Sequence, residues 1–236
     1  APPDATTVLK TRLVKGDAPD IISLSADRSF ADFVDANILE DLSGKIDFSV
    51  IDPIYNQMLK ELEIERVDGI YGVPYALNAS GVIYNKDIFE ELGLSIPKTW
   101  DEFLGVAQTV QDNGITPFYF TLKESWTSLP VWNTIASTLV SSDSSKKVNS
   151  KETTFNEIYS ETTDKIMKLM KYGHSDNFGV GYNDGNTAFA NGESAMYLQG
   201  SYAIPAILTV NPDLNLGMFP LPASNNEEEN KLVSGV

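Results

Sequence analysis

Residues 71–100 constrain the fold more than any other stretch, because they contain two short apolar runs joined by a polar link. The first run begins one residue before this stretch, covers residues 70–73 and is broken by Pro74, and the second covers residues 82–84. Short runs of this kind predict β-strands rather than one continuous helix. The polar link at residues 76–80 therefore predicts a chain that leaves one sheet and enters another, with a ligand cleft beside the crossover.

The composition limits the partners and cross-links that the chain can have. Its 236 residues carry 17 basic and 33 acidic side chains, a net charge of −16, which argues against binding to nucleic acid or to an anionic membrane. The absence of cysteine excludes disulfides, iron–sulfur clusters and cysteine-ligated zinc. No apolar run approaches the roughly 20 residues that a membrane-spanning helix needs.

Strand and helix signals alternate along the chain. A buried strand is predicted at residues 21–24, with a helix after it, and the capping box Thr99-x-x-Glu102 predicts the start of another helix. The serine-rich stretch 141–150 predicts a mobile surface loop. Because strands and helices alternate in this way, we expect an α/β protein.

Two changes of sheet, near Asn78 and Phe219, predict two lobes joined by crossing strands. We expect residues 1–77 to form the first lobe, with residues 219–236 returning to it. Residues 78–218 are then expected to form the second lobe. Both lobes are expected to be incomplete in this chain.

Four groups of residues point to a family when they are taken together. They are Gly16–Ile22, then Tyr71–Tyr75 with Val82–Lys86, then Gly93–Leu94 with Pro97–Phe103, and finally Ala188–Met196 with Gly200–Tyr202. In order and separation they resemble the extracellular solute-binding proteins of ABC importers, specifically the sugar-binding family 1 group related to maltose-binding protein. The resemblance implies a type II fold of two lobes that close around a ligand by a hinge motion. It also implies that the chain is a fragment that lacks both ends.

Sugar recognition requires aromatic faces for the C–H side of the ring and polar groups for its hydroxyls. Set against the family, Asp27 and Arg28 fall where polar sugar contacts lie, although a surface ion pair would explain them equally well. Asn78 falls on the crossover, where the family carries a carboxylate or amide and where a turn-forming residue would also fit. Tyr75, next to the crossover, is the other candidate contact in this part of the chain.

A second set of candidates lies beyond the strand predicted at residues 116–121. Glu124 and Trp126 have polar neighbours, and a Trp here resembles the stacking platform of the family, although a core Trp is the alternative. Tyr202 stands where the family usually has a stacking Trp. The preceding Gly200 permits close approach of the backbone. We therefore expect Glu124, Trp126, Gly200 and Tyr202 to contact the ligand.

The leading prediction is a binding protein that captures a mono- or oligosaccharide and delivers it to an ABC-type permease, without enzymatic activity, cofactor or metal. An enzyme is the alternative, because Asp27 and Glu124 could form the carboxylate pair of a glycosidase. A binding protein for ferric ion or a polyamine is a third possibility, which the 10 tyrosines permit. The single histidine, His174, offers little support for a catalytic triad or a histidine-rich metal site.

The resemblance also implies where such a protein works. We expect a monomer, either lipid-anchored on the extracellular face of the cytoplasmic membrane or free in a periplasm. No nucleic-acid partner is expected.

Overall fold

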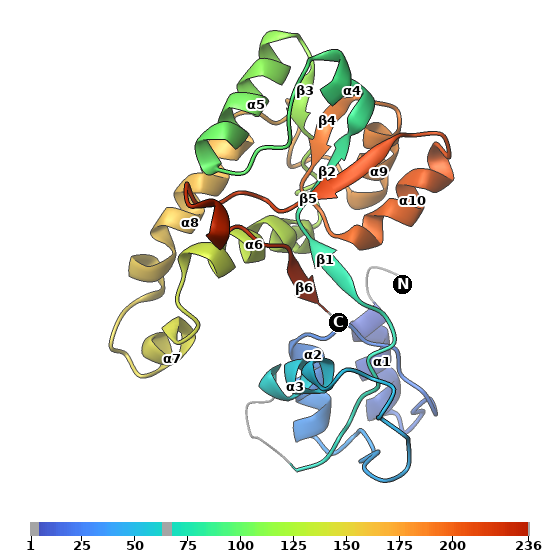
Figure 1. Ribbon diagram of the computed structural model, residues 1–236. Helices are drawn as coiled ribbons and strands as arrows, with labels where there is room; N and C mark the ends of the chain where they lie inside the picture. Colours follow the sequence, from blue (N-terminus) through green and yellow to red (C-terminus); the bar gives the residue numbers. More distant parts are fainter. Residues whose placement is uncertain (1–4, 63–67, 236) are drawn as a thin grey trace. The chain divides into compact units, whose positions relative to one another are not determined.

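The computed structural model describes residues 5–62 and 68–235, which separate into two compact units (Figure 1). The first unit extends to Leu77, and the second covers residues 78–235. We expected the chain to return to the first lobe from residue 219 onwards. Residues 219–235 instead belong to the second unit, because the strands that they contain pair with strands at residues 78–85 of that unit.

The described part of the first unit contains the helices α1 (Ala5–Val14), α2 (Arg28–Asp35) and α3 (Pro53–Leu62). Phe30 and Val34 of α2 pack against Leu59 of α3 in a small core, and Tyr71 lies against it. The strand predicted at residues 21–24 is not formed. A strand needs a neighbour for its backbone hydrogen bonds, and residues 5–62 and 68–77 include no other strand. Ile21 is accordingly 87% exposed.

The second unit is organised around a sheet of four strands in the order β3-β4-β2-β5. Antiparallel pairing joins β2 to both β4 and β5, whereas β3 and β4 run parallel. Ile83 on β2 lies opposite Tyr197 on one side and Met218 on the other. The strands are β2 (Val82–Asn85), β3 (Thr116–Phe118), β4 (Ser194–Tyr197) and β5 (Leu216–Phe219). A separate antiparallel pair joins β1 (Asn78–Ser80) to β6 (Val233–Gly235).

Helices cover both faces of this sheet (Figure 1). One face carries α4 (Lys86–Glu91), α5 (Trp100–Asp112) and α8 (Phe155–Met170), and the other carries α9 (Tyr182–Ala190) and α10 (Ile204–Val210). Successive strand residues point to opposite faces, so Val82 packs with Phe103 of α5, whereas Ile83 packs with Ile207 of α10. This alternation gives the unit two cores, one on each side of the sheet.

The start of α5 confirms a prediction from the sequence. Thr99 accepts a hydrogen bond from the backbone of Glu102, and the Glu102 carboxylate accepts one from the backbone of Thr99, which completes the capping box. Trp100 follows and is 6% exposed, as expected for a packed residue. The ammonium group of Lys165 lies 4.2 Å from the centre of the Trp100 ring.

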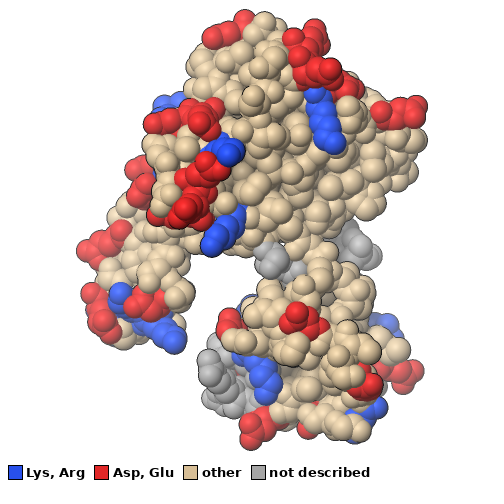
Figure 2. Space-filling view, in the orientation of Figure 1, with Lys and Arg blue, Asp and Glu red and all other residues tan. Residues whose placement is uncertain are grey.

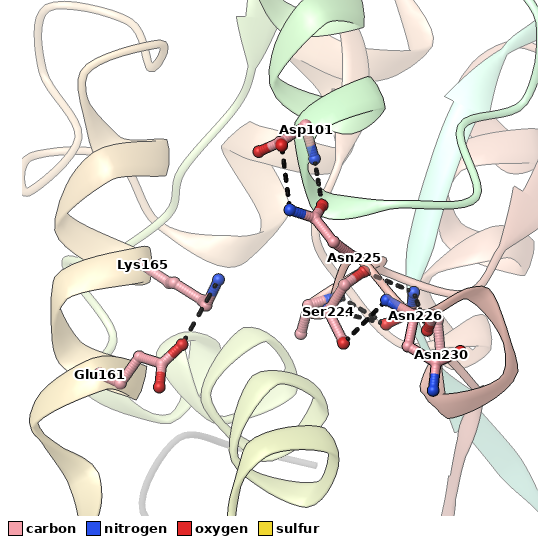
Figure 3. A network of polar contacts seen from close by, with 8 residues as sticks. Asp101, Glu161, Lys165, Ser224, Asn225, Asn226 and Asn230 are labelled. Atoms are coloured by element: carbon pink, nitrogen blue, oxygen red, sulfur yellow. Dashed lines mark hydrogen bonds and ion pairs between the residues drawn. The ribbon is translucent and has the colours of Figure 1, made fainter.

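Residues 220–230 fasten the end of β5 to the start of α5 (Figure 3). The Asn225 side chain exchanges hydrogen bonds of 2.9 and 3.0 Å with the side chain and backbone of Asp101. The Asn230 side chain donates to the carbonyl of Lys98 and accepts from the backbone of Ser224. The short helix η3 (Glu227–Glu229) lies within this loop, and Glu227 forms a 2.7 Å ion pair with Lys98.

Because β3 and β4 run parallel, the segments that follow them leave the sheet at the same edge. After β3 the chain forms η1 (Ser125–Ser128) and then α6 (Leu129–Leu139). After β4 it forms η2 (Ser201–Ala203) and then α10. The parallel pair therefore brings two segments that lie more than 70 residues apart in the sequence to one edge of the sheet.

The serine-rich stretch 141–150 was predicted to be a loop, but part of it is helical. It contains the helix α7 (Ser144–Asn149), where Lys147 forms a 2.9 Å ion pair with Asp143 one turn earlier. Within the described ranges, no helix is both long and apolar enough to cross a membrane.

Candidate functional site

Three aromatic side chains meet in the second unit, at the edge where the segments after β3 and β4 leave the sheet. The centre of the Trp126 ring, on η1, lies 4.9 Å from that of Tyr182 and 6.2 Å from that of Tyr202. The rings of Tyr182 and Tyr202 are 6.3 Å apart. Neighbouring planes are inclined by 46–56°, so the rings do not stack flat on one another. We call Trp126, Tyr182 and Tyr202 the aromatic cluster.

The aromatic cluster keeps part of its surface accessible. Trp126 is 40% exposed and Tyr202 is 38% exposed, although both rings have aromatic neighbours. Inclined and half-exposed rings offer flat apolar faces to a ligand and cannot bury those faces fully against one another. The arrangement therefore suits a ligand that has an apolar face and polar edges.

Glu124 links two members of the cluster. Its Oε2 accepts a 3.0 Å hydrogen bond from the indole Nε1 of Trp126, and its Oε1 accepts a 3.0 Å hydrogen bond from the backbone nitrogen of Tyr182. Tyr182 is the first residue of α9, and Gly181 is the N-cap, which has no side chain to cap the helix. The carboxylate thus supplies the acceptor that the start of α9 lacks.

Tyr202 is held by residues that precede it in the sequence. Its hydroxyl donates a 2.9 Å hydrogen bond to Gln199, whose amide nitrogen lies 3.5 Å from the hydroxyl oxygen of Thr121. A Cβ atom at Gly200 would collide with the Tyr202 ring, so only glycine fits there without a shift. The Tyr202 ring makes the close approach that Gly200 permits, and a ligand contact at Gly200 stays a prediction.

Burial changes the acidity of the phenol groups at this site. It raises the pKa of Tyr202 to about 12 and also raises the pKa of Tyr182. The Tyr197 hydroxyl lies deeper, with the residue 1% exposed, and burial raises its pKa further. All three phenols are therefore held in the neutral form.

The structure brings together four of the eight predicted site residues: Glu124, Trp126, Gly200 and Tyr202. Asn78 opens β1 in the same unit and is half-buried. Sequence reasoning missed Tyr182, although its place directly after a glycine at the start of a helix is a signal that could have marked it.

The other three predicted residues lie in the first unit, where each has a local partner. Asp27 caps α2 by accepting a 2.7 Å hydrogen bond from the backbone of Ser29. Arg28 forms a 2.7 Å ion pair with Asp32 in the same helix. Tyr75 is 78% exposed, and its hydroxyl lies 2.7 Å from that of Ser23. The structure thus gives each of these side chains a local role and leaves their ligand contacts as predictions.

On the face that Figure 2 draws, acidic side chains are scattered over each unit and interleaved with Lys and Arg, rather than gathered in one field. Among the residues that the structure describes, no three His, Asp or Glu side chains gather closely enough to hold a metal ion. The distinctive chemistry of the site is therefore aromatic.

Comparisons with known proteins give consistent matches. A sequence model of the bacterial extracellular solute-binding proteins matches residues 3–235. The multiple sugar-binding protein of Streptococcus mutans is 34% identical over 232 residues, and the melibiose/raffinose/stachyose-binding protein MelE of Bacillus subtilis is 22% identical over 253 residues. These matches cover 93% and 98% of this chain but only 53% and 55% of the two relatives. The chain thus spans about half the length of the curated relatives that it matches.

Solved structures agree with the sequence matches. The solute-binding protein RafE, solved in complex with raffinose, superposes with a TM-score of 0.82 at 30% sequence identity. The match covers 100% of this chain and 62% of RafE. It confirms the expected fold class, the α/β fold of type II solute-binding proteins.

Proposed function

This chain belongs to the bacterial extracellular solute-binding protein family, and on that premise we propose that it binds a carbohydrate for an ABC-type importer. The proposed ligand class is an oligosaccharide of the raffinose type. Relatives named for multiple sugars and for raffinose support this choice, since the chain is 34% and 30% identical to them.

The aromatic cluster is the observation that carries the proposal. A pyranose ring has an apolar C–H face that packs well on an aromatic ring, and its hydroxyls project from the edge of the ring. Trp126 and Tyr202 offer such faces while remaining 40% and 38% exposed. Glu124 and Gln199 accept hydrogen bonds from the polar edges of these two rings and so hold the rings in place. Fixed and accessible aromatic faces match the need of sugar recognition for an apolar surface.

Two competing functions are less well supported by the same residues. Asp27 and Glu124, the carboxylate pair that a glycosidase would need, already accept hydrogen bonds as a helix cap and as the partner of Trp126. Ferric ion would bind phenolate oxygens, but burial favours the neutral phenol at Tyr182, Tyr197 and Tyr202. We therefore propose binding without bond making or breaking.

In the proposed function the protein captures the sugar by the hinge closure of a two-lobe solute-binding protein and then transfers it. The closed form then docks on a membrane permease. We propose that the protein acts as a monomer on the outer face of the cytoplasmic membrane, held by a lipid anchor, or in a periplasm.

A thermal-shift screen of the 236-residue chain tests the proposal. The probes are raffinose, stachyose and maltose, with spermidine and ferric citrate as representatives of the competing ligands. A sugar present at 100 times its Kd should stabilise the chain by about 2.7 kcal/mol. We expect raffinose or stachyose to raise the Tm. A shift with spermidine or ferric citrate and none with any sugar would contradict the proposal.

A further inference from the structure

We propose that Glu124 is a positioning residue, which fixes the Trp126 ring and the start of α9 relative to each other, rather than a direct sugar contact. The inference rests on the proposed function for its effect on binding. Its structural basis is independent of the ligand, because each carboxylate oxygen already has a defined protein partner.

The two hydrogen bonds of Glu124 reach two members of the aromatic cluster. Oε2 holds the edge of the Trp126 indole at 3.0 Å, and Oε1 holds the backbone of Tyr182 at 3.0 Å. The rings of these two residues lie 4.9 Å apart. The carboxylate therefore bridges η1 to α9 at the point where the rings meet, and its position determines their spacing and tilt.

The local backbone is adapted to this bridge. Gly181 precedes Tyr182, and a Cβ atom at Gly181 would lie 2.8 Å from Oε1 of Glu124. Glycine leaves room for the carboxylate at the start of the helix, where unpaired N–H groups and the helix dipole favour a negative charge. A residue 57 positions earlier in the sequence thus takes the place of the missing side-chain cap.

The chemistry requires a carboxylate and not only a polar group. The indole N–H and the backbone N–H are both donors, so each needs an acceptor. Glutamine has the same shape but presents one oxygen and one NH₂ group, so one of the two N–H groups would face another donor. Glu124→Gln should therefore release either the Trp126 ring or the start of α9.

The test combines Glu124→Gln with Trp126→Phe, which keeps an aromatic face and removes the indole donor. Raffinose affinity is measured by calorimetry for both variants and for the double variant. We expect Glu124→Gln to weaken binding by about tenfold, the size associated with losing a hydrogen bond to a charged group. In the Trp126→Phe background the same change should have a smaller effect, because the indole hydrogen bond to Glu124 is already absent there. Equal effects in both backgrounds would show that Glu124 does not act through the Trp126 ring and would overturn the inference.

A spectroscopic measurement tests the positioning role without any sugar. The chain has three tryptophans, so loss of one indole N–H signal in Trp126→Phe identifies the signal of Trp126 in heteronuclear NMR. We expect this signal or the backbone amide signal of Tyr182 to shift, and its hydrogen exchange to accelerate, in Glu124→Gln. If both signals were unchanged in a folded Glu124→Gln variant, the inference would be overturned. If wild type does not bind raffinose but the signal shifts as expected, the proposed function fails while the positioning role stands.

Two controls separate positioning from general damage. Glu90→Gln removes a carboxylate from an exposed residue of α4 and should leave the affinity and the indole signals unchanged. Gly181→Ala displaces the carboxylate while Glu124 is retained, so it should reproduce the shifted Trp126 signal and the weaker binding. Gly105→Ala is its matched control, because a Cβ atom there meets nothing within 4 Å. Should Glu124→Gln fail to fold, wild-type behaviour of Gly181→Ala would overturn the inference.

Discussion

The hydroxyl of Tyr202 donates a 2.9 Å hydrogen bond to Oε1 of Gln199, three residues earlier in the chain. This bond fixes the polar end of the ring while leaving the residue 38% exposed. Gln199 itself is 1% exposed, so the bond anchors an accessible aromatic ring to a buried amide. The ring is therefore held in place before any ligand arrives.

The burial of the Tyr202 hydroxyl predicts that the folded chain loses stability at alkaline pH. Burial raises the pKa of Tyr202 from 10.0 to about 12, so the folded chain keeps the phenol proton in a range where the unfolded chain loses it. The resulting stability is fully present below pH 10 and is lost as pH rises towards 12. Urea unfolding at pH 8 and pH 11 should show a smaller loss for Tyr202→Phe than for wild type. The same loss in both proteins would contradict this account.

Asp41 predicts a loss of stability at the acid end. Hydrogen bonds from the side chain and backbone of Ser43, and from the backbone of Ile70, hold the pKa of Asp41 at about 2. The folded form thus favours the carboxylate, and its contribution is present above pH 3.8 and is lost as pH falls towards 2. Asp41→Asn should be less stable than wild type at pH 6 in urea unfolding. The difference in stability between the two proteins should shrink at pH 2.5. A difference that stays constant would contradict the predicted role of the Asp41 carboxylate.

Asn230 should contribute strongly to the stability of the second unit. Its amide donates to the carbonyls of Lys98 and Ser224 and accepts from the backbone of Ala223 and Ser224, at distances of 2.9–3.0 Å. Asn230→Ala should lower the free energy of unfolding by about 2–3 kcal/mol, since each net hydrogen bond contributes about 0.5–1.5 kcal/mol. Asn230→Asp keeps the acceptor oxygen and should lose less. Equal losses would show that the bonds accepted from the backbone of Ala223 and Ser224 add nothing.

Gly200→Ala should weaken sugar binding while the fold is kept. The added Cβ collides with the Tyr202 ring, which must then rotate or shift away from Trp126. We expect raffinose affinity to fall about tenfold or more, which corresponds to about 1.4 kcal/mol. Circular dichroism checks the fold, and Gly105→Ala in α5 serves as the neutral control. Unchanged affinity in Gly200→Ala would mean that the position of Tyr202 does not matter.

Local signals predicted much of the second unit. The capping box at Thr99 and Glu102 placed the start of α5 correctly, because the residues that form it lie only three positions apart. Trp126 and Tyr202 could be paired only through a family resemblance, since their proximity depends on the parallel pairing of β3 with β4. Periodicity within one segment carries no information about such pairing.

One strand was predicted wrongly and one site residue was missed, because local sequence carries no information about tertiary partners. Residues 21–24 have the composition of a strand, but a strand forms only beside a partner, and the described part of the first unit offers none. Tyr182 was missed because its role depends on Glu124, whose carboxylate reaches it across 58 positions of sequence. Tertiary partners, rather than local preference, decided both cases.

Calorimetric titration of raffinose into wild type, Trp126→Ala and Trp132→Ala tests the central claim most directly. Trp132 is the matched control, because it also belongs to an aromatic group, with its ring 6.0 Å from that of Phe155 and outside the aromatic cluster. We predict that wild type and Trp132→Ala bind raffinose with similar affinity, whereas Trp126→Ala binds at least about tenfold more weakly. Undiminished affinity in a folded Trp126→Ala variant would contradict the claim that the aromatic cluster holds the sugar.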